Sequence, residues 1–233
     1  MTVCKLAGIP IAFHHRYPQF RVHMQEYLTE EAPLLSLSVS DEEIAAEMKD
    51  DRAAARPASC ESLALYRKLC TALPLYGGFF LHAALLSVDG VGVAITARSG
   101  VGKSTHAALW RDMLADRCSI LNGDKPLFRR GDDGHFYGYG TPFAGKEGWH
   151  KNASVRIGAV LLLERAEVDS MTPLAPQEAF PALYAATLTP RSTDSLAALL
   201  PLLADFSEGV RFFRAAVTKE PSAAACAYAA IFG

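Results

Sequence analysis

The sequence lacks the features that assign a chain to several specialised classes of protein. Its 233 residues include five scattered cysteines without a C-x-x-C pair, which argues against a disulfide framework and a zinc site. No apolar run approaches the length that spans a bilayer, and the apolar stretch near the N-terminus is short. We therefore expect a cytoplasmic protein with neither a signal peptide nor a membrane partner.

An excess of basic residues is also missing. The formal net charge is -2, and the longest basic cluster is the pair Arg129 and Arg130. Proteins that neutralise many nucleic-acid phosphates carry a basic excess, so we expect no nucleic-acid partner. The length suits one large domain with a small appendage. We predict an N-terminal accessory segment, residues 1–75, packed on a main domain, residues 76–233, and the sequence is compatible with a homo-oligomer.

Hydrophobic periodicity predicts strands that alternate with helices, which indicates an α/β sheet. Between the first two strands lies a polar stretch with His14, His15 and His23, which we interpret as exposed residues rather than metal ligands because no carboxylate or cysteine stands at ligand spacing. The predicted strands are 5–13, 34–40, 79–88, 92–96, 118–121, 156–163 and 210–217, with a hairpin at 130–139. The predicted helices begin at Asp41 and span 60–73, 103–116, 176–187, 193–206 and 221–231.

The strongest motif is a glycine-rich loop at residues 97–105, which matches G-x-x-x-x-G-K-[ST] except that Ala97 stands at the first position. A left-handed backbone at Ala97 would cost on the order of 1 kcal/mol. In such loops, backbone N–H groups and a helix N-terminus attract phosphate oxygens. We predict that the loop binds ATP or another nucleoside triphosphate through Ser99, Gly100, Val101, Gly102, Lys103, Ser104 and Thr105.

Within this loop, Lys103 is predicted to reach the β- and γ-phosphates, and the Ser104 hydroxyl to bind Mg²⁺. Two residues outside the loop, Asp124 and His82, also need an interpretation. Asp124 ends an apolar strand, where it is predicted to hold the same Mg²⁺; the alternative is that it caps a turn. His82 lies within the apolar run 79–88, and periodicity alone favours a buried core histidine.

Residues 82–126 resemble the catalytic domain of bacterial HPr serine kinase/phosphorylase, through His82, the segment 89–93, the loop 99–104 and Asp124. A more distant similarity is to the phosphoenolpyruvate carboxykinase fold, whose loop also has the form S-G-x-G-K-[ST]. The resemblance implies an α/β phosphoenolpyruvate carboxykinase-like P-loop domain with a mixed sheet and flanking helices. It also implies that His82 lies beside the transferred phosphate.

The resemblance has two gaps. The paired aspartates of those kinases, one for magnesium and one as base, correspond to Gly123 and Asp124, so one is missing. Their glutamate-isoleucine-arginine-glycine segment is replaced by residues 138–147. There Lys146 can act as a charge clamp and Glu147 as a substitute base, or both can belong to a plain exposed loop. Arg191 has the same two interpretations, charge stabilisation or an exposed arginine.

The sequence thus favours an ATP-dependent phosphotransferase acting on a hydroxyl of a small molecule or a protein serine. The acceptor proton would go to Asp124 or Glu147, with His82 taking part. The alternative is a nucleotide-binding or sensing module without turnover, which the missing aspartate at Gly123 favours. Decarboxylation of the carboxykinase type would need a second metal with further histidine and carboxylate ligands, which the sequence does not offer.

Overall fold

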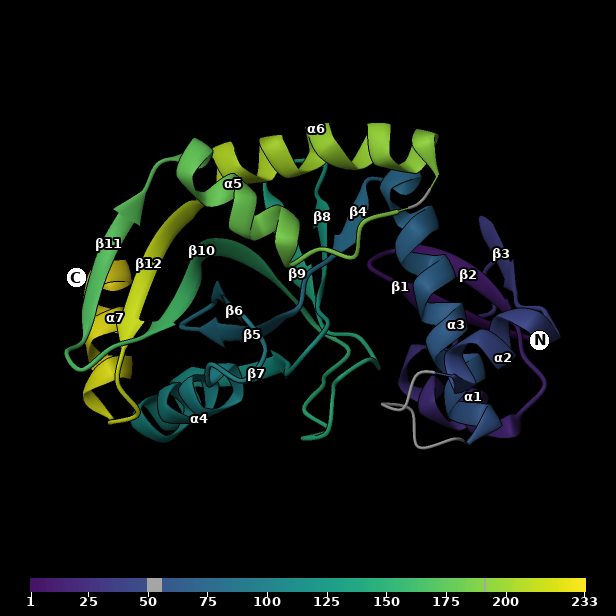
Figure 1. Cartoon of the computed structure of the whole chain (residues 1–233), viewed down its shortest axis with the longest axis horizontal. Coiled ribbons are helices and arrows are strands. Elements are labelled where there is room, and N and C mark those ends of the chain that lie inside the picture. Colours follow the sequence, from purple (N-terminus) through teal and green to yellow (C-terminus); the bar gives the residue numbers. More distant parts are fainter. Residues whose placement is uncertain (50–55, 191) are drawn as a thin grey trace.

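The computed structural model describes residues 1–49, 56–190 and 192–233, which form two sheets with helices packed around them (Figure 1). The smaller sheet has the order β1-β2-β3, and the larger one is mixed, with nine strands in the described part of the chain. In the larger unit, runs of strands are separated by helices: α4 follows β4–β6, α5 and α6 follow β7–β11, and α7 follows β12. The predicted α/β class, with a mixed sheet and flanking helices, is therefore confirmed.

The N-terminal part contains three short strands and three helices. These are β1 (Thr2–Leu6), β2 (Ile9–His14), α1 (Pro18–His23), β3 (Leu35–Ser38), α2 (Asp41–Met48) and α3 (Pro57–Ala72), with 3-10 turns at Gln25–Tyr27 and Leu73–Tyr76. The single strand predicted over 5–13 is wrong. Ala7 and Gly8 adopt positive φ angles of 49° and 79° and turn the chain, so that β1 and β2 pair antiparallel.

One helix of this part was predicted from the sequence and another was not. The predicted helix start at Asp41 is confirmed, because Ser40 and Glu43 form a capping box in which each side chain accepts the other's backbone N–H. Helix α1 was not predicted. Its six residues bury only Phe20, so no apolar periodicity reveals it.

The main sheet follows the order β4-β8-β9-β10-β6-β5-β7, and β12 pairs with β10 and β11. Its elements are β4 (Gly78–Phe80), β5 (Ala83–Val88), β6 (Val91–Ala97), α4 (Lys103–Leu114), β7 (Cys118–Asn122), β8 (Leu127–Arg130), β9 (Phe136–Tyr139), β10 (Ser154–Arg165), β11 (Ser170–Leu174), α5 (Pro176–Ala185), α6 (Thr193–Gly209), β12 (Arg211–Val217) and α7 (Ser222–Phe232), with a 3-10 turn at Ala115–Arg117. Strand β10 runs parallel to β6 and β12, whereas β5 and β6 form the predicted antiparallel hairpin.

Helices cover both faces of this sheet (Figure 1). Helices α4 and α7 pack on one face around the buried Trp110, and α5 and α6 pack on the other around the buried Phe206. Neighbouring residues of β5 alternate between the two cores, as Leu85 and Leu86 show. Fully burying an aromatic side chain such as Phe206 contributes roughly 2–3 kcal/mol to the free energy of folding, before the loss of side-chain entropy is counted.

The main sheet differs from the prediction at three segments. The run 79–88 is two strands, because the chain breaks at Leu81 and His82, where His82 N–H donates to Ala186 O at 2.8 Å. The hairpin predicted over 130–139 is present, but its first strand already begins at Leu127. Strand β11 was not predicted, since it is a short edge strand that carries Pro173.

The N-terminal part shares a hydrophobic core with the main sheet. Its buried cluster includes Phe80, Leu127 and Phe143, and the rings of Tyr66 and Phe143 lie 4.8 Å apart. Arg129 also donates a hydrogen bond to Ala7 O at 3.0 Å. Among the residues that the structure describes, no helix has the length and apolar character required to cross a bilayer.

Candidate active site

The glycine-rich loop connects the end of β6 to the start of α4. Gly100 and Gly102 have φ angles of 80° and 125°, and a Cβ atom at either position would meet no atom within 4 Å. The glycines are therefore required by conformation, and the space above them is open. Ala97 belongs to β6 and has no positive φ, so the alanine at the first position carries no conformational cost.

The N-terminus of α4 presents backbone donors to this open space. Its N-cap residue is Gly102, and no side chain caps the helix. The first N–H groups of a helix have no intrahelical acceptor, and the helix dipole adds partial positive charge there. Both properties favour a bound phosphate at Lys103, Ser104 and Thr105.

Lys103 extends from α4 toward the end of β7. Its Nζ donates to Gly123 O at 3.0 Å and lies 3.4 Å from Asp124 Oδ1, and only 10% of its side chain is exposed. Burial lowers the pKa of Lys103, and the nearby Asp124 carboxylate only partly opposes this shift. A desolvated ammonium group at this place is well suited to bind an anionic oxygen.

Asp124 is surrounded by positively charged and hydrogen-bonding groups. Its Oδ1 lies 3.1 Å from His82 Nε2, and its Oδ2 lies 3.4 Å from Lys125 Nζ. Burial alone would raise the pKa of Asp124. The hydrogen bond from His82 and the charges of Lys125 and Lys103 outweigh it and hold this pKa well below its usual range. The carboxylate is therefore ionised at neutral pH.

A buried asparagine fixes the backbone that carries Asp124. Asn122 Nδ2 donates to Thr141 O at 2.9 Å and lies 3.1 Å from Thr141 Oγ1, while its Oδ1 accepts the backbone N–H groups of Asp124 and Lys125 at 2.9 and 2.7 Å. Asn122, rather than Asp124, thus forms the side-chain turn that the alternative interpretation assigned to Asp124. We had not predicted this role for Asn122, although an asparagine before Gly123 and Asp124 is a recognisable turn signal.

His82 is not the buried core histidine that periodicity favours. It lies in the gap between β4 and β5, and 43% of its side chain is exposed. The periodicity argument is wrong at this position because the strand ends before it. Lys125, which pairs with Asp124, is a site residue that we had not predicted. Its Nζ lies 5.0 Å from the centre of the Tyr66 ring, so a residue of α3 supports the site from the N-terminal part.

The loop after β9 closes over Asp124. Gly145 has a φ angle of 73°, and a Cβ atom there would lie 3.0 Å from Asp124 Cβ. Beyond it, Glu147 is only 22% exposed, whereas Lys146 is 90% exposed, and their charged atoms lie 3.9 Å apart. Both residues line the same cavity as Asp124, but Lys146 extends mostly into solvent.

The same loop explains the glycine that stands in place of an aspartate. Gly123 N–H donates to Trp149 O at 2.9 Å, and a Cβ atom at Gly123 would lie 3.3 Å from Ala144 O and 3.5 Å from Trp149. A side chain at this position would push against the loop 144–149. The site is therefore built around one strand-end carboxylate.

These groups enclose a cavity of about 390 Å³. Its lining residues are His82, Arg98, Ser99, Gly100, Gly102, Lys103, Ser104, Thr105, Asp124, Gly145, Lys146 and Glu147. Val101, of the predicted phosphate-binding residues, lines a neighbouring pocket instead and packs against the core beside α4. Arg191 lies outside the described residues.

Arg165, at the end of β10, supports the glycine-rich loop from behind. Its guanidinium group donates to Val101 O at 3.1 Å and also to Gly100 O. We had not predicted this residue, because the contact joins positions far apart in the sequence. Holding these two carbonyl groups limits how the loop can rotate its peptide planes.

The donor set fits a nucleoside triphosphate with Mg²⁺. In the part of the chain that the structure describes, no three His, Cys, Asp or Glu side chains gather into a metal site. Mg²⁺ bound with phosphates needs fewer protein ligands, since phosphate and water oxygens fill most positions. The ionised Asp124 and the Ser104 hydroxyl line one cavity and match that requirement.

Comparison with known proteins gives a matching family model and a distant similarity to solved structures. The family model described as SynChlorMet cassette protein ScmC matches residues 53–194, more than half of the chain. This family is distinct from that of the HPr serine kinase/phosphorylase. No curated protein matches the chain. Among solved structures, the Hpr(Ser) kinase/phosphatase from Coxiella burnetii is similar at 16% identity and a TM-score of 0.33, over 41% of this chain and 77% of that chain.

Proposed function

The chain belongs to the family of the SynChlorMet cassette protein ScmC, and we propose that it is an ATP-dependent phosphotransferase. The enzyme transfers the γ-phosphoryl group of ATP, or of another nucleoside triphosphate, to a hydroxyl of a small molecule or a protein serine. The observation that carries this proposal is the meeting of Lys103, Asp124 and His82 within 3.1–3.4 Å at the open side of the loop. We further propose that the main domain, residues 76–233, is a phosphoenolpyruvate carboxykinase-like P-loop domain of the kind found in HPr serine kinases.

The phosphates bind along the loop. The uncapped N-terminus of α4 and the glycine backbone at Gly100 and Gly102 provide donors, and Lys103 neutralises the β- and γ-phosphates. Phosphoryl transfer depends mainly on positioning and charge stabilisation, which such fixed groups supply without reorganisation.

Ser104 and Asp124 would hold a magnesium ion. When bound, it would offset the negative charge that develops on the transferred group and the leaving diphosphate. The site is consistent with this role, because Asp124 remains ionised and Gly145 approaches its side chain without a Cβ atom in the way.

His82 is the proposed base. His82 Nε2 lies 3.1 Å from Asp124 Oδ1, and in the tautomer with hydrogen on Nε2 the Nδ1 atom is left to accept a proton. Asp124 is a poor base itself, because neighbouring cations hold its pKa low, so it orients His82 instead. Glu147, which lines the same cavity, is the alternative base.

The step is a single displacement at phosphorus. The acceptor oxygen forms a bond to the γ-phosphorus while the bond to the oxygen of the nucleoside diphosphate breaks. The acceptor proton passes to His82 or Glu147, and the diphosphate leaves. No further reactant is needed.

A nucleotide-binding module without turnover is the second candidate, and Gly123 favours it. The chain lacks the second carboxylate of the resembling kinases, and the loop 144–149 leaves little room for one. Such a module would bind nucleotide through the same loop. Such a module would not require a general base beside an acceptor site.

The test is transfer of labelled γ-phosphate from Mg-ATP into a fractionated host extract. Lys103→Ala should abolish labelling and weaken ATP binding by about tenfold or more, because a charge-assisted contact is lost. The exposed Lys219, changed to alanine, is the matched control and should label as the wild type does. If the wild type binds ATP but gives no labelled product, the phosphotransferase is refuted and the sensing module is supported.

A further inference from the structure

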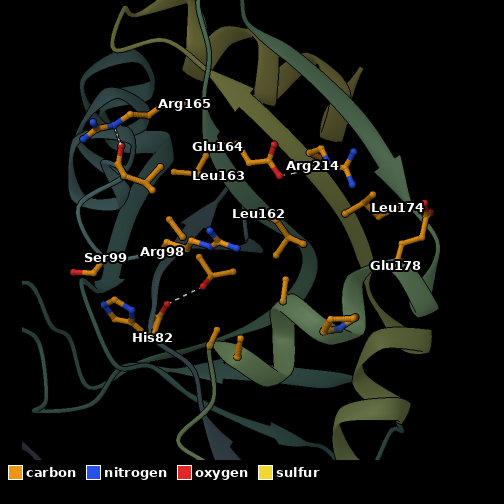
Figure 2. Close-up of a pocket in the computed structure, with 17 residues that line it drawn as sticks. His82, Arg98, Ser99, Leu162, Leu163, Glu164, Arg165, Leu174, Glu178 and Arg214 are labelled. Atoms are coloured by element: carbon orange, nitrogen blue, oxygen red, sulfur yellow. Dashed lines mark hydrogen bonds and ion pairs between the residues drawn. The ribbon is translucent and has the colours of Figure 1, made fainter.

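A second, larger pocket opens beside the phosphate-binding cavity. It has a volume of about 820 Å³ and lies between the ends of β6 and β10, the end of β11, and helix α5 (Figure 2). This volume is in the range of pockets that enclose small organic ligands. The two cavities share three lining residues, His82, Arg98 and Ser99, so they meet at the start of the glycine-rich loop.

The place where the cavities meet decides what the larger pocket can hold. Ser104 and Thr105, at the start of α4, line only the smaller cavity, whereas His82 lines both. In phosphoryl transfer the attacking and leaving oxygens lie on opposite sides of phosphorus. With the diphosphate on the helix N-terminus, the attacking oxygen comes from the side of His82, which is the side of the larger pocket.

One charged side chain in this pocket is available to a ligand. Arg165 donates to the loop carbonyls, Glu178 accepts the backbone N–H of Ala175 at 2.9 Å, and Arg214 lies 3.7 Å from Glu164. In the described chain, Arg98 makes no such hydrogen bond or ion pair, and Figure 2 shows its guanidinium group directed into the pocket between His82 and Leu162. A free guanidinium fork is suited to a carboxylate.

Much of the remaining lining of the pocket is apolar. It includes Leu162 and Leu163 of β10, Leu174 of β11, and Pro181 with alanines of α5. A ligand that only carried charges would leave this lining without a partner. Contact with an apolar body would remove this lining from water, which favours binding in proportion to the apolar surface buried.

We propose that this pocket binds the phosphoryl acceptor, and that the acceptor is a small hydroxylated carboxylic acid with an apolar body. Its carboxylate pairs with Arg98, its apolar part packs against Leu162, Leu174 and Pro181, and its hydroxyl lies at His82. The hydroxyl proton passes to His82 as the oxygen bonds to the γ-phosphorus and the diphosphate leaves. This inference rests on the proposed phosphotransferase function.

The binding test uses β-hydroxy fatty acids from hydroxybutyrate to hydroxydecanoate, titrated calorimetrically without nucleotide. We expect binding that strengthens with chain length, and a loss of about tenfold or more for the methyl esters. Arg98→Gln should weaken binding of the acids by a similar factor and leave the esters unchanged. Arg156→Gln, an exposed arginine outside the pocket, is the control. Failure of every acid to bind, or equal binding of acid and ester, overturns the proposal.

The transfer test separates this proposal from the function on which it rests. With Mg-ATP, label should enter the acid that binds best, and Arg98→Gln should raise the KM for the acid by a larger factor than it weakens ATP, because Arg98 lines both cavities. If acids bind through Arg98 but label never leaves ATP, the phosphotransferase fails while the acid-binding pocket stands. If Arg98→Gln instead weakens ATP more than it weakens the acid, or ATP displaces the acid, the pocket belongs to the nucleotide. If label enters only a protein, the small-acid class is wrong.

Discussion

The imidazole Nε2 of His82 lies 3.1 Å from Oδ1 of Asp124, although the two residues belong to separate breaks in the main sheet. His82 stands between β4 and β5, and Asp124 follows β7. Backbone hydrogen bonds fix the approach, because Ala83 N–H donates to Asp124 O at 3.0 Å and Leu81 N–H to Pro126 O at 3.3 Å. The pair is thus held by the sheet rather than by flexible side chains alone.

His82→Gln tests the base. It should lower kcat by about a hundredfold or more while changing ATP affinity by less than about twofold, because general base catalysis typically contributes that much. Glu147→Gln is the matched comparison and should leave kcat within about tenfold of the wild type. The measurement is steady-state transfer together with ATP titration. The reverse ranking of the two variants would assign the base to Glu147.

Asp124→Asn tests the ion cluster through the pH dependence of stability. The folded-state pKa of Asp124 lies below its unfolded value, so the stability it contributes is present above about pH 4 and is lost as pH falls further. The difference in unfolding free energy between wild type and Asp124→Asn should therefore shrink on acidification from about pH 4. Urea unfolding at several pH values measures it. A difference that stays constant would mean that Asp124 is not favourably paired.

Gly145→Ala tests the close approach of the loop to Asp124. The positive φ angle costs on the order of 1 kcal/mol for alanine, and the new Cβ atom would also lie 3.0 Å from Asp124 Cβ. Gly148→Ala is the control, since Gly148 has a φ angle of 65° but no atom within 4 Å of a Cβ. Both variants should lose stability in thermal unfolding, Gly145→Ala by more because of this contact, and Gly145→Ala alone should impair Mg-ATP binding. Equal binding by both variants would show that the contact with Asp124 is unimportant.

Arg165→Ala tests the support of the glycine-rich loop. Without its hydrogen bonds to Gly100 O and Val101 O, the loop should lose preorganisation and bind ATP about threefold to tenfold more weakly. Amide hydrogen exchange should be faster at Gly100 and Gly102 and unchanged in β12. Arg165→Lys, which keeps the charge but not the fork, should recover only part of the affinity. Full recovery by lysine would mean that charge alone matters.

His106→Gln tests the packing of α4 behind the loop through the pH dependence of stability. The histidine is buried, accepts a hydrogen bond from Trp110 Nε1 at 3.1 Å, and burial lowers the pKa of His106 to about 4. The unfolded chain binds the proton more readily, so stability should fall by on the order of 2 kcal/mol between about pH 6.5 and pH 4. His106→Gln should show a smaller fall over this range in denaturant titrations. An equal fall in both proteins would assign the effect to other groups.

Much of the fold was predictable from local signals. The strand, loop and helix around residues 91–114 follow from an apolar run, a turn at Asp89-Gly90 and a helical periodicity, and the capping box at Ser40 marks the start of α2. These signals work because each depends on residues a few positions apart. Where the deciding contact is distant or the element is short, as for α1, β11 and the break at His82, local patterns were insufficient or wrong.

The sequence by itself determined the glycine-rich loop, because a lysine and close-approach glycines at fixed spacing are a local requirement for holding phosphates. It also determined that the fold combines strands and helices in an α/β arrangement. Only the tertiary structure decided which side chains face that loop. Pairing of β5 with β7 brings His82 to Asp124, Arg165 crosses from β10 to the loop carbonyls, and the loop 144–149 leaves little room beside Gly123. Each of these contacts joins residues far apart in the chain, and sheet register, which no local pattern specifies, sets their distance.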